Sequence, residues 1–185
     1  MKYLRFSIMP ILLLLSIISL LMGPLYIILY FILLDGTFIL GDYFIPQDTK
    51  KPNYNKTWIL NSLLFINLPL LIVLFFILGW YCSNTDIFGF GMWLQKFSIN
   101  IIEHKSNMQF YHYLIAVISS GLSLTAAGTN VGHEHVHRTR DKISMWIGNW
   151  LIALSFDMAF AIEHVYGHHR NVCLKSDPVT AQRGE

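Results

Sequence analysis

The sequence predicts an all-α protein embedded in a membrane, with about four transmembrane helices, and three observations lead to this fold class. Hydrophobic residues make up 54% of the 185 residues and charged residues only 13%, whereas about 25% of residues are charged in typical soluble domains. Three apolar stretches, at 6–34, 58–80 and 109–127, approach or exceed the roughly 20 residues that cross a bilayer. The basic residues are divided unequally between the connecting segments, as is usual in membrane proteins.

The first apolar stretch has more than one interpretation because Met22-Gly23-Pro24 interrupts it. It forms either one tilted helix or a hairpin with arms at about 6–22 and 24–41. A hairpin leaves only Lys96 and Lys105 on one side of the membrane and places the other basic residues opposite them: Lys2, Arg5, Lys50, Lys51, Lys56, Arg138, Arg140, Lys142, Arg170, Lys175 and Arg183. A single helix would move the first two of these across, so the positive-inside rule favours the hairpin. A third alternative is a signal peptide at 1–22, but no small-x-small cleavage site follows it.

The stretches at 58–80 and 109–127 complete four expected spans in one membrane domain that covers residues 1–185. With the hairpin, residues 128–142 face the cytoplasm. We therefore expect an integral membrane protein, in contact with the lipid bilayer. The net charge of +2 is small and the basic residues are scattered, which argues against nucleic-acid binding. Cys82 and Cys173 form no CxxC pair, so neither a disulfide framework nor a cysteine metal site is indicated.

The segment 143–162 has the length of a further span, but it carries Asn149 and Asp157. A charge at the membrane centre costs at least about 2.5 kcal/mol on insertion scales. Histidine clusters also lie on both sides of this segment, and a straight helix of that length would separate them by roughly 30 Å. If the two clusters form one site, the segment does not span the membrane, and we expect an interfacial or re-entrant helix.

Six of the eight histidines fall between 133 and 169, in the clusters GHEHVHR (132–138) and EHVYGHHR (163–170). Helical positions four apart share a face, so His133 is expected to project beside His137, and His164 beside His168. His169 lies about 100° further round the second helix. These histidines are costly to bury without partners, and we expect all five to bind metal. Of the remaining three, His135 points away from the first pair, and His104 and His112 are expected to be hydrogen-bonded at the membrane interface.

Carboxylates accompany both clusters. Glu134 and Glu163 neighbour ligand histidines, and they either accept a hydrogen bond from the free N–H of an imidazole or are solvated at the helix ends. Asp157 is a third candidate for such an acceptor. All-nitrogen sites with nearby carboxylates suit zinc, iron, copper or nickel.

One alternative assigns zinc to the first cluster alone. Residues 133–137 form an HExxH pattern, in which two histidines hold zinc and Glu134 acts as a base, as in an intramembrane zinc protease. That assignment gives the second cluster no role, and the LDG at 34–36 precedes the HExxH, in the reverse of the order that such proteases use. A metal transporter or sensor is a further, non-enzymatic alternative.

Taken together, the two clusters resemble the histidine boxes of the integral-membrane alkane hydroxylase and xylene monooxygenase family, within the membrane fatty acid desaturase and hydroxylase superfamily. The first box, His-Glu-x-x-His-Lys/Arg, is matched by His133, Glu134, His137 and Arg138. The second, Glu-His-x-x-Gly-His-His, is matched by Glu163, His164, Gly167, His168 and His169. The spacing between the boxes, Asp177-Pro178 and Arg183-Gly184-Glu185 are also similar to that family. The resemblance is strong over about 125–185 and only topological before that.

This resemblance implies a non-haem di-iron monooxygenase that uses O2 to hydroxylate an unactivated C–H bond of a lipophilic substrate, such as an alkane or an alkyl-aromatic compound. Electrons would come from NAD(P)H through a reductase and a rubredoxin or ferredoxin-type carrier. A fatty acid desaturase with the same site is the alternative within the superfamily. The family also has a third histidine box downstream, which these 185 residues lack. We therefore expect the N-terminal part of a longer enzyme, with little or no activity alone.

Overall fold

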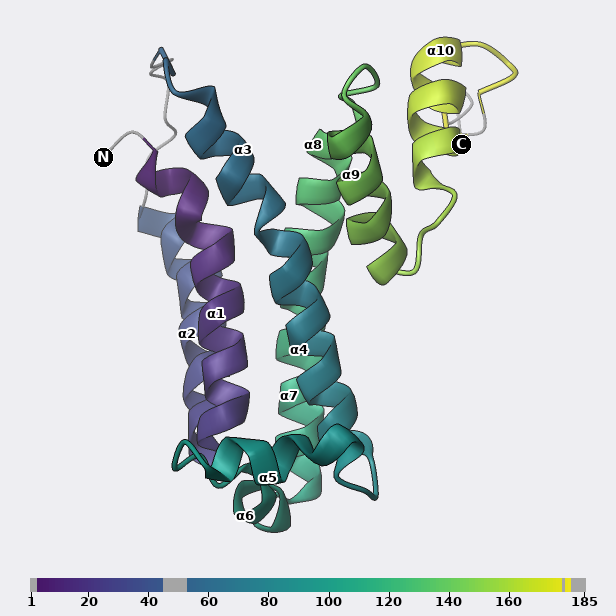
Figure 1. The fold of residues 1–185 in the computed structure, drawn as a ribbon. Helices are drawn as coiled ribbons and strands as arrows, with labels where there is room; N and C mark the ends of the chain where they lie inside the picture. The colour runs from purple at the N-terminus through teal and green to yellow at the C-terminus, as the bar shows by residue number, and fades with distance from the viewer. Residues whose placement is uncertain (1–2, 45–52, 178, 181–185) are drawn as a thin grey trace.

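The computed structural model describes residues 3–44, 53–177 and 179–180, and the regular structure in these ranges is helical (Figure 1). Lys2, Lys50, Lys51, Pro178 and Arg183-Gly184-Glu185, which entered the sequence analysis, lie outside the described residues. In chain order the elements are η1 (Leu4–Ser7), α1 (Ile8–Met22), α2 (Pro24–Phe44), α3 (Thr57–Phe65), α4 (Asn67–Cys82), η2 (Ile87–Gly89), α5 (Phe90–Gln95), α6 (Ile101–Ser106), α7 (Phe110–Leu124), η3 (Thr125–Thr129), α8 (Asn130–Val136), α9 (Lys142–Leu154), η4 (Ala161–His168) and α10 (His169–Asn171).

Four helical segments among the described residues are long and apolar enough to cross a membrane. They are Leu4–Met22, Pro24–Phe44, Thr57–Cys82 and Phe110–Val136. This confirms the predicted all-α membrane architecture with four spans. The fourth span is longer than expected, because α7 continues through the π-helical turn η3 into α8. The first histidine cluster is thus the direct extension of a transmembrane helix.

The first apolar stretch is a hairpin, as its sequence predicts. Gly23 ends α1 with a φ of 101°, a left-handed conformation that side chains rarely adopt, and Pro24 begins α2. A Cβ at Gly23 would also lie 2.9 Å from Cγ of His104 on α6. The tight turn therefore needs glycine both for its backbone and for the close approach of α6.

The bundle core forms where α1 packs between α2 and α4 and where α7 packs against α2. Leu13, Ile27 and Leu71 are almost fully buried there. Two hydrogen bonds cross between spans: the Tyr30 hydroxyl pairs with Ser123 Oγ at 2.8 Å, and the Tyr81 hydroxyl donates to the Leu20 carbonyl at 2.6 Å. Many apolar side chains on the outer faces remain exposed, as expected where a helix meets lipid.

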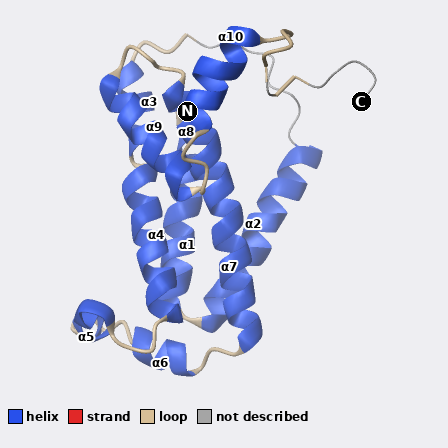
Figure 2. Cartoon of the chain, turned by 90° about the vertical axis from the view of Figure 1, so that its right-hand side faces the viewer, coloured by secondary structure: helices blue, strands red, loops and turns tan. Residues whose placement is uncertain are grey.

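At the end of the bundle far from the histidine clusters, α5 and α6 lie across the helix ends (Figures 1 and 2). The Lys105 ammonium group donates to the Trp80 carbonyl at 3.0 Å and to the Ser83 carbonyl, at the C-terminal end of α4. His104 Nδ1 donates to the Leu21 carbonyl at 2.9 Å, and His112 Nδ1 accepts the Gln109 N–H at 3.0 Å. The expectation that these two histidines are hydrogen-bonded is confirmed.

At the other end, α9 returns along α8 without crossing the membrane. Its 13 residues span about 20 Å, and after a turn the chain reaches η4 beside α8 (Figure 1). Two glycines allow α8 and α9 to approach closely: a Cβ at Gly132 would lie 3.2 Å from the Gly148 carbonyl oxygen, and one at Gly148 would lie 3.0 Å from the Gly132 oxygen. This close, short return brings the two histidine clusters to the same end of the molecule, as the sequence predicts.

Candidate metal centre

The first half of the candidate site lies at the end of α8, which carries His133; His137 directly follows Val136, the last residue of this helix. The ring centroids of His133 and His137 are 4.7 Å apart, as expected for positions four apart in a helix. His135 lies on the opposite face of α8, fully buried, with its ring stacked on Phe65 at a centroid distance of 5.2 Å. Its exclusion from the expected ligand set agrees with this position.

The second half of the site lies in η4, which is a π-helix and not an α-helix. The His169 backbone N–H donates to the His164 carbonyl, five residues earlier. A π-helix has hydrogen bonds between residues five apart, so His164 is paired most closely with His169. The expectation that His164 and His168 share a face assumed α-helical spacing; their rings do stack, with centroids 5.7 Å apart, and the π-helix brings the His169 ring still closer to that of His164, at 4.5 Å.

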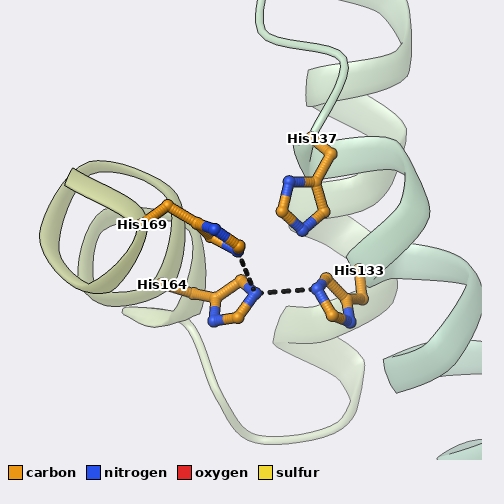
Figure 3. Close-up of side chains that lie close together, drawn as sticks. All are labelled: His133, His137, His164 and His169. Atoms are coloured by element: carbon orange, nitrogen blue, oxygen red, sulfur yellow. Dashed lines mark hydrogen bonds between the residues drawn. The ribbon is translucent and has the colours of Figure 1, made fainter. Parts of the chain in front are cut away.

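The two halves meet around His164 (Figure 3). His164 Nε2 lies 2.7 Å from His133 Nε2 and 3.0 Å from His169 Nε2. The rings of His137 and His169 have centroids 4.7 Å apart, which closes the group. One nitrogen of each of the four imidazoles lies within 4.8 Å of all the others. Two segments 31 residues apart therefore bring four imidazole nitrogens into one small volume.

The surroundings favour the uncharged imidazoles that metal binding requires. Burial, followed by repulsion from His133 and His169, lowers the pKa of His137. Burial, followed by repulsion from the neighbouring histidines, lowers the pKa of His164 as well. Phe160, which the sequence analysis did not identify, stacks on the His164 ring at a centroid distance of 4.6 Å and supplies part of this apolar cover. A lowered pKa leaves the ring nitrogens available as ligands at neutral pH.

His168 lies beside the four-histidine group instead of inside it. Its ring is stacked with that of His164, with centroids 5.7 Å apart, and its Nδ1 donates to Asp177 Oδ2 at 2.9 Å. Desolvation acts to raise the pKa of Asp177, but hydrogen bonds from Thr180, Val179 and His168 together outweigh it and lower this pKa. The sequence analysis gave Asp177 no role, because nothing in its spacing from the histidines indicates a contact.

The three carboxylates expected to orient the histidines occupy other positions. Glu134 is exposed and pairs with Arg138 at 3.1 Å, and Arg138 also donates to Asn61 Oδ1 on α3 at 2.7 Å. Glu163 and Asp157 are exposed as well, and Asp157 lies in the turn after α9. None of the hydrogen bonds described for these three side chains reaches a histidine ring, so their assignment as acceptors stays a prediction.

A cluster of this kind can hold a transition-metal ion. Four convergent imidazoles without thiolate donors suit zinc, copper, nickel or iron. His133 and His164 are half-buried while His137 and His169 are exposed, so the group lies at the protein surface at the end of the fourth span.

The chain is similar to curated proteins over most of its length. "Alkane 1-monooxygenase 1" of Alcanivorax borkumensis is 26% identical over 152 residues, which are 82% of this chain and 32% of that protein. "Alkane 1-monooxygenase" of Ectopseudomonas oleovorans is 24% identical over 153 residues, 83% of this chain and 32% of that protein. The protein of that name from Pseudomonas putida is 30% identical over 79 residues, 43% of this chain and 19% of that protein.

The chain thus spans about a third of the length of the first two of these relatives. No family model and no solved structure matches it.

Proposed function

The chain is homologous to the alkane 1-monooxygenases, and we propose that it carries part of the iron-binding membrane domain of a monooxygenase. The reaction is the hydroxylation of an unactivated C–H bond of a lipophilic substrate, such as the terminal methyl group of an alkane. The observation that supports this most directly is the convergence of four imidazole nitrogens within 4.8 Å at the end of a transmembrane helix.

The donor set fits the irons that such a monooxygenase uses. His133, His137, His164 and His169 would hold an ion, and His168, whose ring stacks on that of His164, would be a further ligand. When bound, iron supplies the redox chemistry with O2 that a metal of fixed oxidation state such as zinc lacks. Uncharged imidazoles hold the ions without neutralising their charge. The all-nitrogen cluster is therefore compatible with iron, and the proposal of two irons rests on the resemblance to the di-iron monooxygenases.

We infer that this centre would lie at the boundary between the membrane and water. The half-buried rings of His133 and His164 hold it against the protein at the end of a span, while His137 and His169 are open to solvent. A substrate dissolved in the bilayer can approach along the apolar helices. Electrons would arrive from the aqueous side, from NAD(P)H through a reductase and a rubredoxin or ferredoxin-type carrier.

The same arrangement supports a cytoplasmic location of the site in a bacterial inner membrane. The hairpin of α1 and α2 brings the N-terminus to the end of the bundle where the histidines lie (Figure 1). Arg138, Arg140, Arg170 and Lys175 lie at this end, and Lys96 and Lys105 at the other. By the positive-inside rule the histidine end faces the cytoplasm.

Activity of these 185 residues alone is a separate question, and we expect little or none. Two ions need more protein donors than five imidazoles, and the resemblance implies that a third histidine box supplies them. Purified chain supplied with O2, NAD(P)H, a reductase and a carrier should leave an alkane unoxidised. Robust oxidation by this polypeptide would contradict that expectation.

Metal analysis of the purified chain tests the proposal. We expect iron to be retained after anaerobic reconstitution, and to be lost in His133→Ala and in His164→Ala. His104→Gln is the matched control, because it changes a histidine at the opposite end of the bundle that binds a backbone carbonyl. Binding of a single zinc ion that does not depend on His169, together with proteolytic activity that requires Glu134 as a base, would instead favour a protease. Metal retention that is unchanged in both alanine variants would contradict the proposed site.

A further inference from the structure

The contact between His168 and Asp177 is unlike the contacts among the other four expected ligands. Those four rings face one another, whereas His168 Nδ1 donates a 2.9 Å hydrogen bond to Asp177 Oδ2. The Asp177 side chain has no solvent exposure, and that of His168 has 24%. A buried carboxylate is thus attached to an imidazole that borders the candidate metal centre.

Asp177 is itself held in place from the chain segment that follows it. The Thr180 hydroxyl donates to the same oxygen, Oδ2, and the Val179 N–H donates to Oδ1 at 3.1 Å. Its own backbone N–H donates to the Leu174 carbonyl at 3.0 Å. With both carboxylate oxygens engaged, the direction in which Oδ2 accepts from His168 is fixed.

The hydrogen bond also decides which nitrogen of His168 remains available. A carboxylate can only accept, so Nδ1 must carry a proton, and in the uncharged imidazole the lone pair is then on Nε2. The ring plane is fixed as well, because it stacks on His164 with an interplanar angle of 24°. His168 therefore presents one defined donor atom in one defined orientation beside the four-histidine group.

We propose that Asp177 is a positioning residue of the metal centre: it selects the Nδ1–H tautomer of His168 and orients Nε2 to bind a metal ion. Metal-binding histidines commonly donate their second ring N–H to a carboxylate, which fixes the tautomer and increases the basicity of the ligand. The inference rests on the proposed metal-binding function. It assigns His168 a ligand role distinct from that of the four histidines that already converge.

A structural role is the competing explanation, in which the contact only ties residues 172–180 to η4. The two roles differ in their dependence on His168. A positioning residue acts through His168 alone, so its removal has no effect on metal binding when His168 is absent. A structural tether would still matter, because the fold of the tail would change in either background.

Cobalt(II) is a suitable probe, because its visible absorption reports the ligands around it. The full 185-residue chain in detergent would be titrated with cobalt(II) under anaerobic conditions. We expect Asp177→Ala to lower the affinity by about 10–100-fold and to change the absorption bands. Asp177→Asn, which keeps an oxygen acceptor, should lose less. Glu103→Gln, which removes a negative charge from α6 at the opposite end of the bundle, should bind as the unmodified chain does.

The double variant decides between the two roles. Asp177→Ala introduced into His168→Ala should cause almost no further loss, since the two residues act as a unit. A further loss as large as that in the unmodified background would overturn the proposal in favour of the tether. An Asp177→Ala chain with unchanged affinity and absorption would overturn it too.

A metal-free measurement covers the case in which variants fold poorly. In a chain labelled with nitrogen-15 in histidine, the His168 signals should report the Nδ1–H tautomer before any metal is added, and Thr180→Val should weaken that preference. Signals typical of the Nε2–H tautomer would overturn the proposal. Absence of cobalt binding by the unmodified chain would have a different meaning, because it would contradict the metal centre itself.

Discussion

Substitution of Gly148 by alanine gives the sharpest test of how the two histidine clusters are held together. Gly148 lies in the middle of α9, where the helix passes α8. A Cβ there would lie 2.7 Å from Cβ of His135, 3.0 Å from the Gly132 carbonyl oxygen and 3.0 Å from Cγ1 of Val136. These atoms belong to the backbone of α8 or are attached close to it. They cannot move aside as a flexible side-chain end can, so the helices must separate.

The magnitude follows from two opposing effects. Forcing an additional carbon into a packed interface costs about 1–3 kcal/mol. Replacing glycine by alanine inside a helix stabilises the folded state by about 0.5–1 kcal/mol. Since the contacts at Gly148 involve rigid atoms, we expect the upper part of the first range and a net destabilisation of about 1–2 kcal/mol.

The assay is reversible unfolding in mixed detergent micelles, with Gly121→Ala as the matched control. Gly121 lies inside α7, and a Cβ there would have no neighbour within 4 Å, so only the helix preference should act and the variant should be equal or more stable. Gly148→Ala should also weaken metal binding, because His133 and His137 lie at the end of α8 while the opposing histidines follow α9. A Gly148→Ala chain as stable as Gly121→Ala would refute the close packing of α8 and α9.

Three further predictions concern the rest of the bundle. Tyr30→Phe removes the buried hydrogen bond to Ser123 between α2 and α7 and should destabilise the chain by about 0.6 kcal/mol, the average for such bonds in a membrane, in the same unfolding assay. Lys105→Met should cost about 1–2 kcal/mol there, because the last carbonyls of α4 lose a charged donor. Asp141→Ala should lower the thermal midpoint, because the Asp141 carboxylate accepts from the N–H and the hydroxyl of Ser144 at the start of α9. These bonds lower the pKa of the Asp141 carboxyl from 3.8. Its contribution to stability is therefore complete above pH 3.8 and is lost as the pH falls through the lowered pKa. If the thermal midpoints of the unmodified and Asp141→Ala chains differed by the same amount at pH 7 and in strong acid, this reasoning would be contradicted.

The sequence predicts the membrane architecture well, because the features that decide it are local. Gly23 and Pro24 mark the turn of the first hairpin, and the distribution of lysine and arginine selects it over a single helix. The failure of residues 143–162 to span could also be predicted, from Asp157 and from the need to bring the histidine clusters together. The pairing of His133 with His137 follows directly from α-helical spacing.

The details of the second cluster could not be predicted in this way. A π-helix inserts one residue into a helical turn, and nothing in the local pattern of residues 161–168 specifies that insertion. The insertion pairs His164 with His169 and leaves His168 free to meet Asp177, a residue nine positions away on an irregular segment. Contacts made by irregular backbone have no sequence period, so spacing alone could not have identified Asp177.

Both histidine clusters occur next to a π-helical turn, and this has a common physical consequence. Each inserted residue rotates the helix beyond it by about 100°, which changes the face on which the following side chains lie. In the fourth span, η3 precedes His133 and turns the end of the helix relative to its lipid-facing part. Gly128 in this turn lies against the Leu151 carbonyl within α9 and against Ser155, which follows α9. In η4 the insertion lies within the cluster itself. A span whose apolar face is set by the bilayer can therefore end in histidines that face a different direction, toward one another, without any change in the tilt of the helix.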